Sequence, residues 1–346
     1  MLLQLNDSGQ GASAKGKNDL AVAWEGVDFL FVDKVLMIGC ELLHNMSSAL
    51  SEAKGCTDAF GGLNMIFAGD FVQLPLIGDV RLYKDVDTSR RSSGVMRKSQ
   101  AKILGRLLWL SVEVVVLLHE TMRQSGEGNA NFMGLLGHLS SGICTDIDYE
   151  LLRGRVLENA QVKVMDKWRD TPVIVANNAS KDAINIHAME AFATKTGSRL
   201  VWYHATDIHK KSRIRDKCLI ESLEGQHSRQ TKHRLRRIPL VLGMPVSINQ
   251  NFDMRARVVN GSWGYVQDVR YVTDDEGLRY LKSCMVEIPK SDNVSMLHLP
   301  ERHFPILPDV TEIKFEHNAL HKRCVIKRKQ VPVEPGFAMT AHKAQG

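Results

Sequence analysis

The sequence has no long hydrophobic run and no paired cysteines, and both absences narrow the class of protein. No stretch contains the roughly 18 apolar residues that a membrane-spanning helix needs, and residues 1–20 lack the pattern of a secretory signal. No fixed repeat is present, which excludes collagen-like and coiled-coil chains. The cysteines are too widely spaced for a zinc site or a disulfide framework. They are Cys40, Cys56, Cys144, Cys218, Cys284 and Cys324.

The composition that remains is that of an ordinary globular chain. Hydrophobic residues make up 44% of the sequence and charged residues 24%, which excludes a chain that is mainly disordered. The length of 346 residues predicts two or three domains at roughly 150 residues per domain.

Positive charge is concentrated in one stretch. The whole chain has a net charge of +6, yet residues 209–237 alone contain ten Lys or Arg and three acidic residues, a net +7. Such a surplus predicts contact with a polyanion, and Arg234, Arg236 and Arg237 are candidate phosphate contacts. A solvated, charged surface without a partner is the alternative.

Short apolar runs that end in polar residues predict an α/β fold. Four runs are typical of strands buried on both faces of a parallel sheet. They span residues 29–32, 65–68, 112–118 and 173–176. Helical patterns occupy residues 40–53 and 179–196 between them. In such folds, ligands bind at the carboxyl ends of the strands.

The pattern changes after about residue 240. Short strands separated by Gly and Pro are predicted at residues 240–246, 263–266, 269–272 and 284–288, with a turn at residues 273–277. Together they predict a small antiparallel, barrel-like β insertion. Residues 327–335 then lead to a further sheet strand that ends near residue 340.

Chemically useful side chains follow the predicted sheet strands. Asp33 ends the first strand, where a carboxylate can hold a Mg²⁺ that bridges nucleotide phosphates. Asp70 and Gln73 follow the second strand, and Arg123 follows the third. An Arg at such a place can stabilise the charge of a transferring phosphoryl group. A basic pair at residues 342–343 ends the last strand, and this shared position favours one functional site.

Five motifs resemble those of the Pif/RecD group of superfamily-1 DNA helicases, over residues 24–346. FVDKVLM resembles the family's I-D-E-x-S-M, and FGGLNMIFAGDFVQLP resembles F-G-G-x-x-x-x-x-G-D-F-x-Q-L-P. LHETMRQ resembles L-x-x-x-x-R-Q. LGMPVSINQN with VVNGSWGYV resembles G-x-P-V…N…N-G-x-x-G-x-V, and FAMTAHKAQG resembles A-x-T-x-H-K-x-Q-G. Helicases carried by fungal Helitron-type transposons are especially similar.

The resemblance implies a P-loop-type α/β fold with two RecA-like motor domains. ATP would bind in the cleft between them, and single-stranded DNA would lie across both. Residues 1–23 would be a flexible lead-in, residues 24–150 an incomplete first motor domain and residues 151–346 the second. The second domain would carry the β insertion at about residues 262–330.

Site residues are implied where this sequence matches the family's motifs. Asp33 would hold Mg²⁺, with Asp70 beside the nucleotide, Gln73 at the γ-phosphate and Arg123 as an arginine finger. Residues 260–261 would open the β insertion. The residues implied to lie on the DNA side and to couple it to the nucleotide are Thr340, His342 and Lys343.

Three departures from the family bear on activity. The family's P-loop, G-x-x-G-x-G-K-[ST], should precede residues 29–32, but the similar sequence at residues 11–17 is followed by Asn18 instead of a Mg²⁺-binding Ser or Thr. Lys34 replaces the Glu that polarises the attacking water, and an ammonium cannot accept a proton. The chain ends at Gly346, before the family's final Ser-Arg. These departures predict a truncated copy with impaired turnover.

The expected function is an ATP-dependent 5′-to-3′ DNA helicase that uses ATP and Mg²⁺ and is impaired in this chain. Its expected partners are single-stranded DNA and duplex or folded DNA, with no membrane partner. A monomer in the nucleus is expected, with the mitochondrion as a second location. A non-catalytic remnant that binds single-stranded DNA is the alternative, and a measurement of ATP hydrolysis separates the two.

Overall fold

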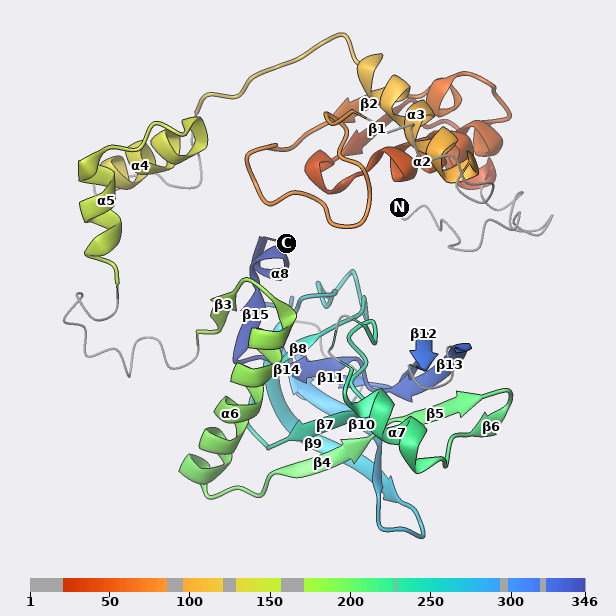
Figure 1. The fold of residues 1–346 in the computed structure, drawn as a ribbon, viewed down its shortest axis with the longest axis vertical. Helices are drawn as coiled ribbons and strands as arrows, with labels where there is room; N and C mark the ends of the chain where they lie inside the picture. The colour runs from red at the N-terminus through yellow and green to blue at the C-terminus, as the bar shows by residue number, and fades with distance from the viewer. Residues whose placement is uncertain are drawn as a thin grey trace. The chain divides into compact units, whose positions relative to one another are not determined.

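A computed structural model describes most of the chain (Figure 1). The described residues are 21–85, 96–120, 129–156, 171–226, 228, 230–292, 298–317 and 322–345. The chain forms two compact units, Met1–Ala160 and Gln161–Gly346. The lead-in predicted at residues 1–23 lies almost entirely outside the described residues. Within the described part, no helix is long and apolar enough to cross a membrane.

The first unit is built on two parallel strands with helices between them. Its elements in chain order are β1 (Phe29–Val32), η1 (Val35–Met37), α2 (Cys40–Lys54), η2 (Ala59–Gly62), β2 (Asn64–Phe67) and α3 (Met96–Leu110). The predicted strand and helix over residues 29–54 are confirmed to within one residue. Leu43, Met46 and Leu50 recur at helical spacing along α2 and pack with Trp24 into the core. Gly105 lets α3 approach α2, because a Cβ there would clash with the Cys40 carbonyl.

The predicted third strand, residues 112–118, does not form. Residues 112–120 have no strand partner, and the side chains of Val114 to Leu118 are 72% to 91% exposed. The prediction that β1 and β2 are buried on both faces is also wrong. Phe29 and Phe31 are 65% and 62% exposed, because the packed residues Leu30 and Val32 alternate with them. The structure therefore buries only one face of this pair.

Two further helices belong to the first unit. They are α4 (Ala130–Ser141) and α5 (Asp146–Arg153). Thr145 starts α5 with a capping box, in which its side chain accepts from the Asp148 amide while the Asp148 carboxylate accepts from the Thr145 amide. His138 of α4 lies 2.9 Å from the same carboxylate, and these contacts hold the pKa of Asp148 below its ordinary value.

The second unit joins the two ends of its own sequence in a parallel pair. Strand β15 (Ala338–Thr340) pairs with β3 (Val173–Val175), and α6 (Asn178–Thr196) packs beside both. The Asn177 side chain caps α6 by accepting from the Ser180 amide at 2.8 Å. The short helix α8 (Ala341–Gln345) follows β15 directly. A strand, a polar end and a helix thus succeed one another, as the sequence predicts.

Antiparallel sheets make up the rest of the second unit. One has the order β11-β10-β9-β8-β14 and another β12-β13-β5-β6, while β4 pairs with β7. The first sheet comprises β8 (Pro245–Ile248), β9 (Trp263–Thr273), β10 (Arg279–Glu287), β11 (His303–Ile306) and β14 (Val333–Pro335). The other elements are β4 (Val201–His204), β5 (Thr206–His209), β6 (Ser212–Arg213), α7 (Lys217–Glu224), β7 (Arg237–Leu240), β12 (Asp309–His317) and β13 (Lys322–Gln330).

The structure corrects the strand boundaries predicted for this region. Residues 240–246 are not one strand, because Gly243, with φ of 80°, forms a turn between β7 and β8. Residues 263–266 and 269–272 belong to a single long strand, β9. The predicted turn at residues 273–277 is confirmed as the β9–β10 hairpin, where the Asp274 carboxylate accepts from the Leu278 amide. Strands on both sides of residue 262 share one sheet. The insertion predicted at about residues 262–330 stays a prediction.

A buried ion cluster connects two of these strands with the residue before β7. The Asp207 carboxylate on β5 accepts two hydrogen bonds from Arg328 on β13, at 2.7 and 2.9 Å, and one from Arg236, at 2.8 Å. The side chains of Asp207 and Arg328 are at most 1% exposed. Charges so far from water are stable only when they are paired and hydrogen-bonded. This cluster therefore fixes β5 and β13 side by side.

Candidate functional site

The ends of β1 and β2 bring two of the predicted acidic residues to one edge. Val32 lies opposite Phe67 in register, and the Ala68 amide donates to the Val32 carbonyl at 2.9 Å. Asp33 follows β1 directly and Asp70 follows β2 after Ala68 and Gly69, so both lie at the carboxyl edge of this parallel pair. Gly69 permits the close approach, because a Cβ there would be 3.0 Å from the Val35 amide.

Asp70 organises the turn that contains Gln73. One carboxylate oxygen accepts from the Val72 amide at 2.9 Å, and the other lies 3.5 Å from the Gln73 side-chain nitrogen. Such an Asx turn fixes the backbone after the strand. The ring of Phe71 anchors the turn by edge-to-face contact with Trp109, with ring centroids 5.7 Å apart. The G-D-F-x-Q motif thus presents Asp70 and Gln73 on an exposed, anchored turn.

Asp33 has the chemistry of a metal ligand at this edge. It is exposed, and one carboxylate oxygen accepts from the Lys34 amide at 2.7 Å. Mg²⁺ is usually held by one or two carboxylates together with water and substrate phosphates. A single carboxylate with one oxygen committed to the backbone therefore fits such an ion. Among the described residues, no cluster of three or more metal-ligating side chains occurs.

Lys34 is held in an unusual backbone conformation beside Asp33. Its φ and ψ are 56° and 46°, in the left-handed region that non-glycine residues seldom adopt. Lys34 is the residue that precedes η1, and its left-handed backbone turns the chain from the end of β1 into this helix. The position of its side chain is therefore set by this turn. Arg123, predicted to face the same edge, lies outside the described residues.

In the second unit, two of the predicted DNA-side residues, His342 and Lys343, line a groove, whereas Thr340 is not among its lining residues. Thr340 ends β15, and His342 and Lys343 lie on α8. The groove has a volume of about 780 Å³. Its lining includes residues 259–263, with the Asn-Gly turn, and also Met339 and residues of α8, and these two segments are called its sides. The cationic or aromatic side chains that line it are Arg257, Trp263, Lys290, His342 and Lys343. Positive charge together with an aromatic ring suits a single nucleic-acid strand.

A contact from each side of this groove fixes that side to a neighbouring segment. The Trp263 indole donates to the Gly336 carbonyl at 3.3 Å, which fastens the start of β9 to the segment before β15. Gly336 is required for this approach, because a Cβ there would lie 2.8 Å from the indole nitrogen. The Lys343 ammonium donates to Asn249, directly after β8, at 2.7 Å. Sequence motifs that lie far apart along the chain therefore form one site.

Lys343 is also paired with a buried acid that the sequence did not identify as important. Its ammonium lies 2.9 Å from the Glu334 carboxylate, and its side chain is only 18% exposed. Burial lowers the pKa of Lys343, and the attraction of Glu334 opposes this effect. Burial alone would raise the pKa of Glu334, but contacts with His233, Lys343 and Lys181 hold it well below its ordinary value.

The three candidate phosphate contacts of the basic stretch differ in exposure. Arg234 is buried and makes a bidentate ion pair with Asp309, at 2.7 and 2.6 Å. Arg236 belongs to the buried Asp207 cluster. Arg237 is 46% exposed and lies over the Trp202 ring, 5.0 Å from its centroid. This geometry favours structural roles for Arg234 and Arg236 and leaves Arg237 on the surface.

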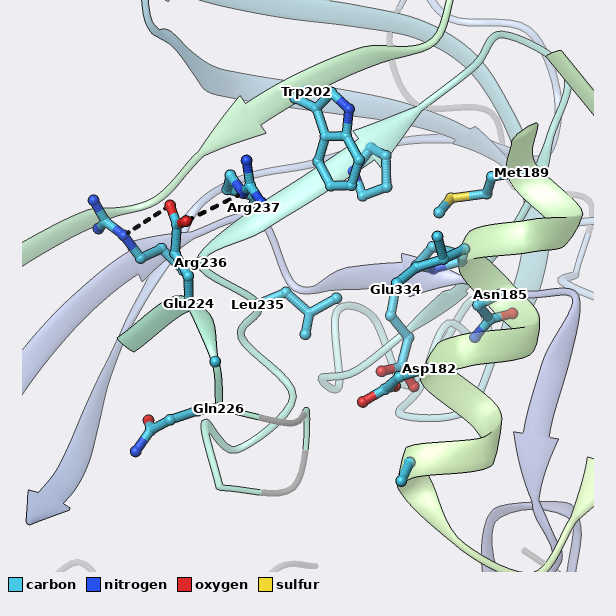
Figure 2. Close-up of a pocket in the computed structure, with 15 residues that line it drawn as sticks. Asp182, Asn185, Met189, Trp202, Glu224, Gln226, Leu235, Arg236, Arg237 and Glu334 are labelled. Carbon is cyan, nitrogen blue, oxygen red and sulfur yellow. Dashed lines mark ion pairs between the residues drawn. The ribbon is translucent and has the colours of Figure 1, made fainter. Parts of the chain in front are cut away.

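Arg237 lies at a second pocket in this unit (Figure 2). The pocket has a volume of about 270 Å³ and lies between α6 and the end of α7. The Glu224 carboxylate sits between the guanidinium groups of Arg236 and Arg237, 3.5 and 3.6 Å away. Its charged groups are therefore largely compensated within the pocket itself.

Comparison with known proteins supports the motif analysis. No family model matches the chain. The ATP-dependent DNA helicase PIF1 of Xenopus laevis is 24% identical over 327 residues, which cover 93% of this chain and 41% of that protein. The helicase of the same name from Danio rerio is 22% identical over 326 residues, with the same coverage. The chain thus spans less than half the length of these relatives.

Solved structures show the same relationship in the fold. Pif1 helicase from Candida albicans superposes with a TM-score of 0.63 at 18% identity, covering 96% of this chain and 66% of that one. Pif1 helicase from Bacteroides in complex with ADP-AlF3 and single-stranded DNA gives 0.61 at 16% identity, covering 99% and 67%. The RecA-like fold and the resemblance to Pif1-type helicases are therefore confirmed. The transposon origin and the truncation stay predictions.

Proposed function

Because the chain resembles the Pif1 helicases in both sequence and fold, we propose that it is part of a DNA helicase motor. In this motor, ATP hydrolysis drives 5′-to-3′ movement along single-stranded DNA and separates duplex or folded DNA. The observation that carries the proposal is the groove of the second unit, which is lined by both the Asn260–Gly261 turn and residues of α8. We further propose that the motor acts as a single copy in the nucleus.

The groove holds the DNA strand by charge and stacking. Lys290 is exposed, and Arg257, with 73% of its side chain exposed, lies at the same rim and pairs with Asp292 at 3.3 Å. Both cations are open to solvent there, where phosphates could reach them. Trp263 offers an aromatic surface, and base stacking on such rings tolerates any sequence. His342 lies on α8, on the opposite side from Asn260. The contact is therefore expected to depend on salt and to show little sequence preference.

The edge of β1 and β2 supplies the nucleotide side. Asp33 would hold Mg²⁺, which neutralises phosphate charge when bound, while Asp70 fixes the turn and Gln73 would contact the γ-phosphate. Arg123 would serve as the arginine finger. Thr340, the last residue of β15, would link the DNA groove to the nucleotide.

Lys34 favours a second candidate function, binding of single-stranded DNA without turnover. The residue after the metal-binding acid is where the family has its general base, and an ammonium cannot accept a proton there. Loss of a general base typically costs about 10²–10⁴ in rate. The 346 residues also contain no G-K-[ST] sequence. Residues 1–346 are therefore expected to bind DNA and to hydrolyse ATP poorly.

Fluorescence anisotropy with a labelled oligothymidylate tests the DNA function. Residues 1–346 should bind it, and the slope of log affinity against log salt should fall by about 0.7 for each phosphate contact removed. Arg257→Ala and Lys290→Ala should each reduce the slope. Lys195→Ala, at the exposed end of α6, is the matched control and should not. Absence of salt-dependent binding by the unaltered chain would overturn the proposal.

A steady-state ATPase assay with single-stranded DNA separates the two candidate functions. The unaltered chain and Lys34→Glu should both remain at background, because the Glu restores a base but not a phosphate-binding loop. DNA-stimulated hydrolysis by residues 1–346 above background would reject the non-catalytic candidate. It would also show that Lys34 is compatible with turnover.

A further inference from the structure

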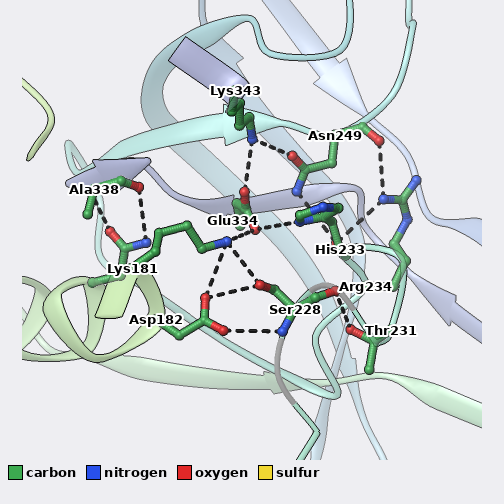
Figure 3. Close-up of polar contacts among 11 residues, drawn as sticks. Lys181, Asp182, Ser228, Thr231, His233, Arg234, Asn249, Glu334, Ala338 and Lys343 are labelled. Atoms are coloured by element: carbon green, nitrogen blue, oxygen red, sulfur yellow. Dashed lines mark hydrogen bonds and ion pairs between the residues drawn. The ribbon is translucent and has the colours of Figure 1, made fainter. Parts of the chain in front are cut away.

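Glu334 lies at the centre of a buried polar network beside the groove (Figure 3). It is part of β14, and its side chain is 3% exposed. One carboxylate oxygen lies 2.9 Å from the Lys343 ammonium, and the other lies 2.9 Å from the Lys181 ammonium. His233 is 3.5 Å from the second oxygen. A single acid thus connects α8, α6 and the loop before β7.

The charge of Lys343 is paired with partners inside the protein. Its ammonium donates to Glu334 at 2.9 Å and to Asn249 at 2.7 Å. With Lys181 and Asp182, which lie 3.2 Å apart, the cluster contains two lysines and two acids and is neutral when His233 is uncharged. A lysine compensated in this way contributes little to phosphate binding directly. Lys343 is therefore expected to act by holding other groups in place.

Lys343 anchors α8 through polar contacts. This helix has five residues, and none of them is buried, so apolar packing provides little to fix it. The bonds from Lys343 reach β14 through Glu334 and the end of β8 through Asn249. Two residues further along, the Asn251 side chain accepts from the Asn260 amide at 3.0 Å. The contacts from Glu334 therefore extend to both sides of the groove.

We infer that Glu334 is a positioning residue for DNA binding: it holds Lys343, and through it α8 and His342, in the wall of the groove. Glu334 acts through Lys343 and does not touch the strand. The inference rests on the proposed DNA function. It differs from a purely structural role, because Lys181 binds the same carboxylate but reaches α6 and Ser228 instead of the groove.

Four variants test this inference in residues 1–346. Glu334→Gln and Lys343→Met each break the anchor, and the double variant measures their coupling. Lys181→Met is the matched control, since it removes the other lysine of Glu334 and leaves the Lys343 contact intact. Amide hydrogen exchange at residues 341–345 reports on α8, and anisotropy with an oligothymidylate reports on affinity and its salt slope.

Glu334→Gln and Lys343→Met should each speed amide exchange in α8 and weaken binding roughly tenfold, with an unchanged salt slope. The double variant should bind no worse than either single variant, because both substitutions break the same Glu334–Lys343 ion pair. Lys181→Met should lower the melting temperature but change neither amide exchange in α8 nor oligothymidylate binding. If Glu334→Gln does not fold, Glu334→Asp replaces it and should show the same effects in weaker form.

Three results would overturn the inference. Tighter binding by Glu334→Gln, with a steeper salt slope, would mean that Lys343 is a phosphate contact that Glu334 restrains. Equal loss of binding in Lys181→Met would reduce Glu334 to a structural role. Unchanged exchange in α8 would exclude the anchor itself. Failure of the unaltered chain to bind DNA, with faster exchange in Glu334→Gln, would instead reject the proposed function and leave the anchor of α8 standing.

Discussion

The turn after β2 and the helix after β15 place functional side chains in opposite ways. In the first unit, Asp70 and Gln73 are exposed and bond mainly within their own turn. In the second unit, Lys343 is largely buried and bonds to Glu334 and Asn249, which lie on other strands or follow them. A substitution in the first site is therefore expected to alter chemistry locally. A substitution in the second alters the fold and the site together.

The same contrast divides the basic stretch. Arg234 and Arg236 lie in buried ion pairs, whereas Arg237 lies on the surface over Trp202. Replacing all three together would mix a loss of stability with a loss of DNA contacts. Each must be tested separately. Substitution of buried Arg234 or Arg236 should change stability, and substitution of exposed Arg237 should change DNA binding.

The largest effect is expected at the buried ion cluster of the second unit. Asp207→Ala should destabilise that unit by about 3–5 kcal/mol, because it leaves the guanidinium groups of Arg328 and Arg236 buried and uncompensated. Urea unfolding measures this change. Glu312→Ala is the control, since its ion pair with Lys327 is exposed and should contribute at most about 1 kcal/mol. Similar losses in the two variants would contradict the cluster's structural role.

Sequence reasoning identified the elements that local pattern determines. The strand and helix over residues 29–54, and the hairpin turn near Asp274, follow from apolar periodicity and turn residues. The strand predicted at residues 112–118 was wrong, because an apolar run forms a strand only where a partner strand supplies hydrogen bonds. Glu334 was missed because a lone acid gives no signal until the fold brings two lysines to it. Arg234 and Arg236 were assigned by charge alone, which cannot distinguish a buried ion pair from a surface contact.

A smaller effect is expected where the groove's two sides meet. Gly336→Ala should destabilise the second unit by about 1–3 kcal/mol, because the new methyl group would overlap the Trp263 indole and the Val246 amide. Urea unfolding measures the loss, and tryptophan fluorescence reports displacement of the indole. Gly225→Ala is the matched control, because its φ of −68° and open surroundings accept a Cβ. An equal response in both variants would show that Gly336 is not specifically required.

Acid should weaken the buried network more than the exposed turn. The folded state holds the pKa of Glu334 below its ordinary value, so its stabilisation is complete above the unfolded carboxyl pKa of about 4.3 and is lost as the pH falls below it. The groups facing Glu334 are Lys181, Lys343, His233 and, through Lys181, Asp182. Urea unfolding between about pH 6 and pH 3 should therefore show a steeper loss in the unaltered chain than in Glu334→Gln. Parallel curves would contradict this assignment.

The smallest effect is expected at Arg237, and it should appear in DNA binding instead of stability. Its guanidinium is 46% exposed, and its contacts with Trp202 and Glu224 are surface contacts that contribute about 1 kcal/mol or less. Arg237→Ala should leave urea unfolding nearly unchanged while reducing the salt slope of oligothymidylate binding by about 0.7, the value for one phosphate. Arg234→Ala should do the reverse, with a large loss of stability and a slope that is unchanged wherever the protein remains folded, because its charge is already neutralised by Asp309. An unchanged slope in Arg237→Ala would make the basic stretch a solvated surface, and the positive charge that serves DNA would then lie at the rim of the groove alone.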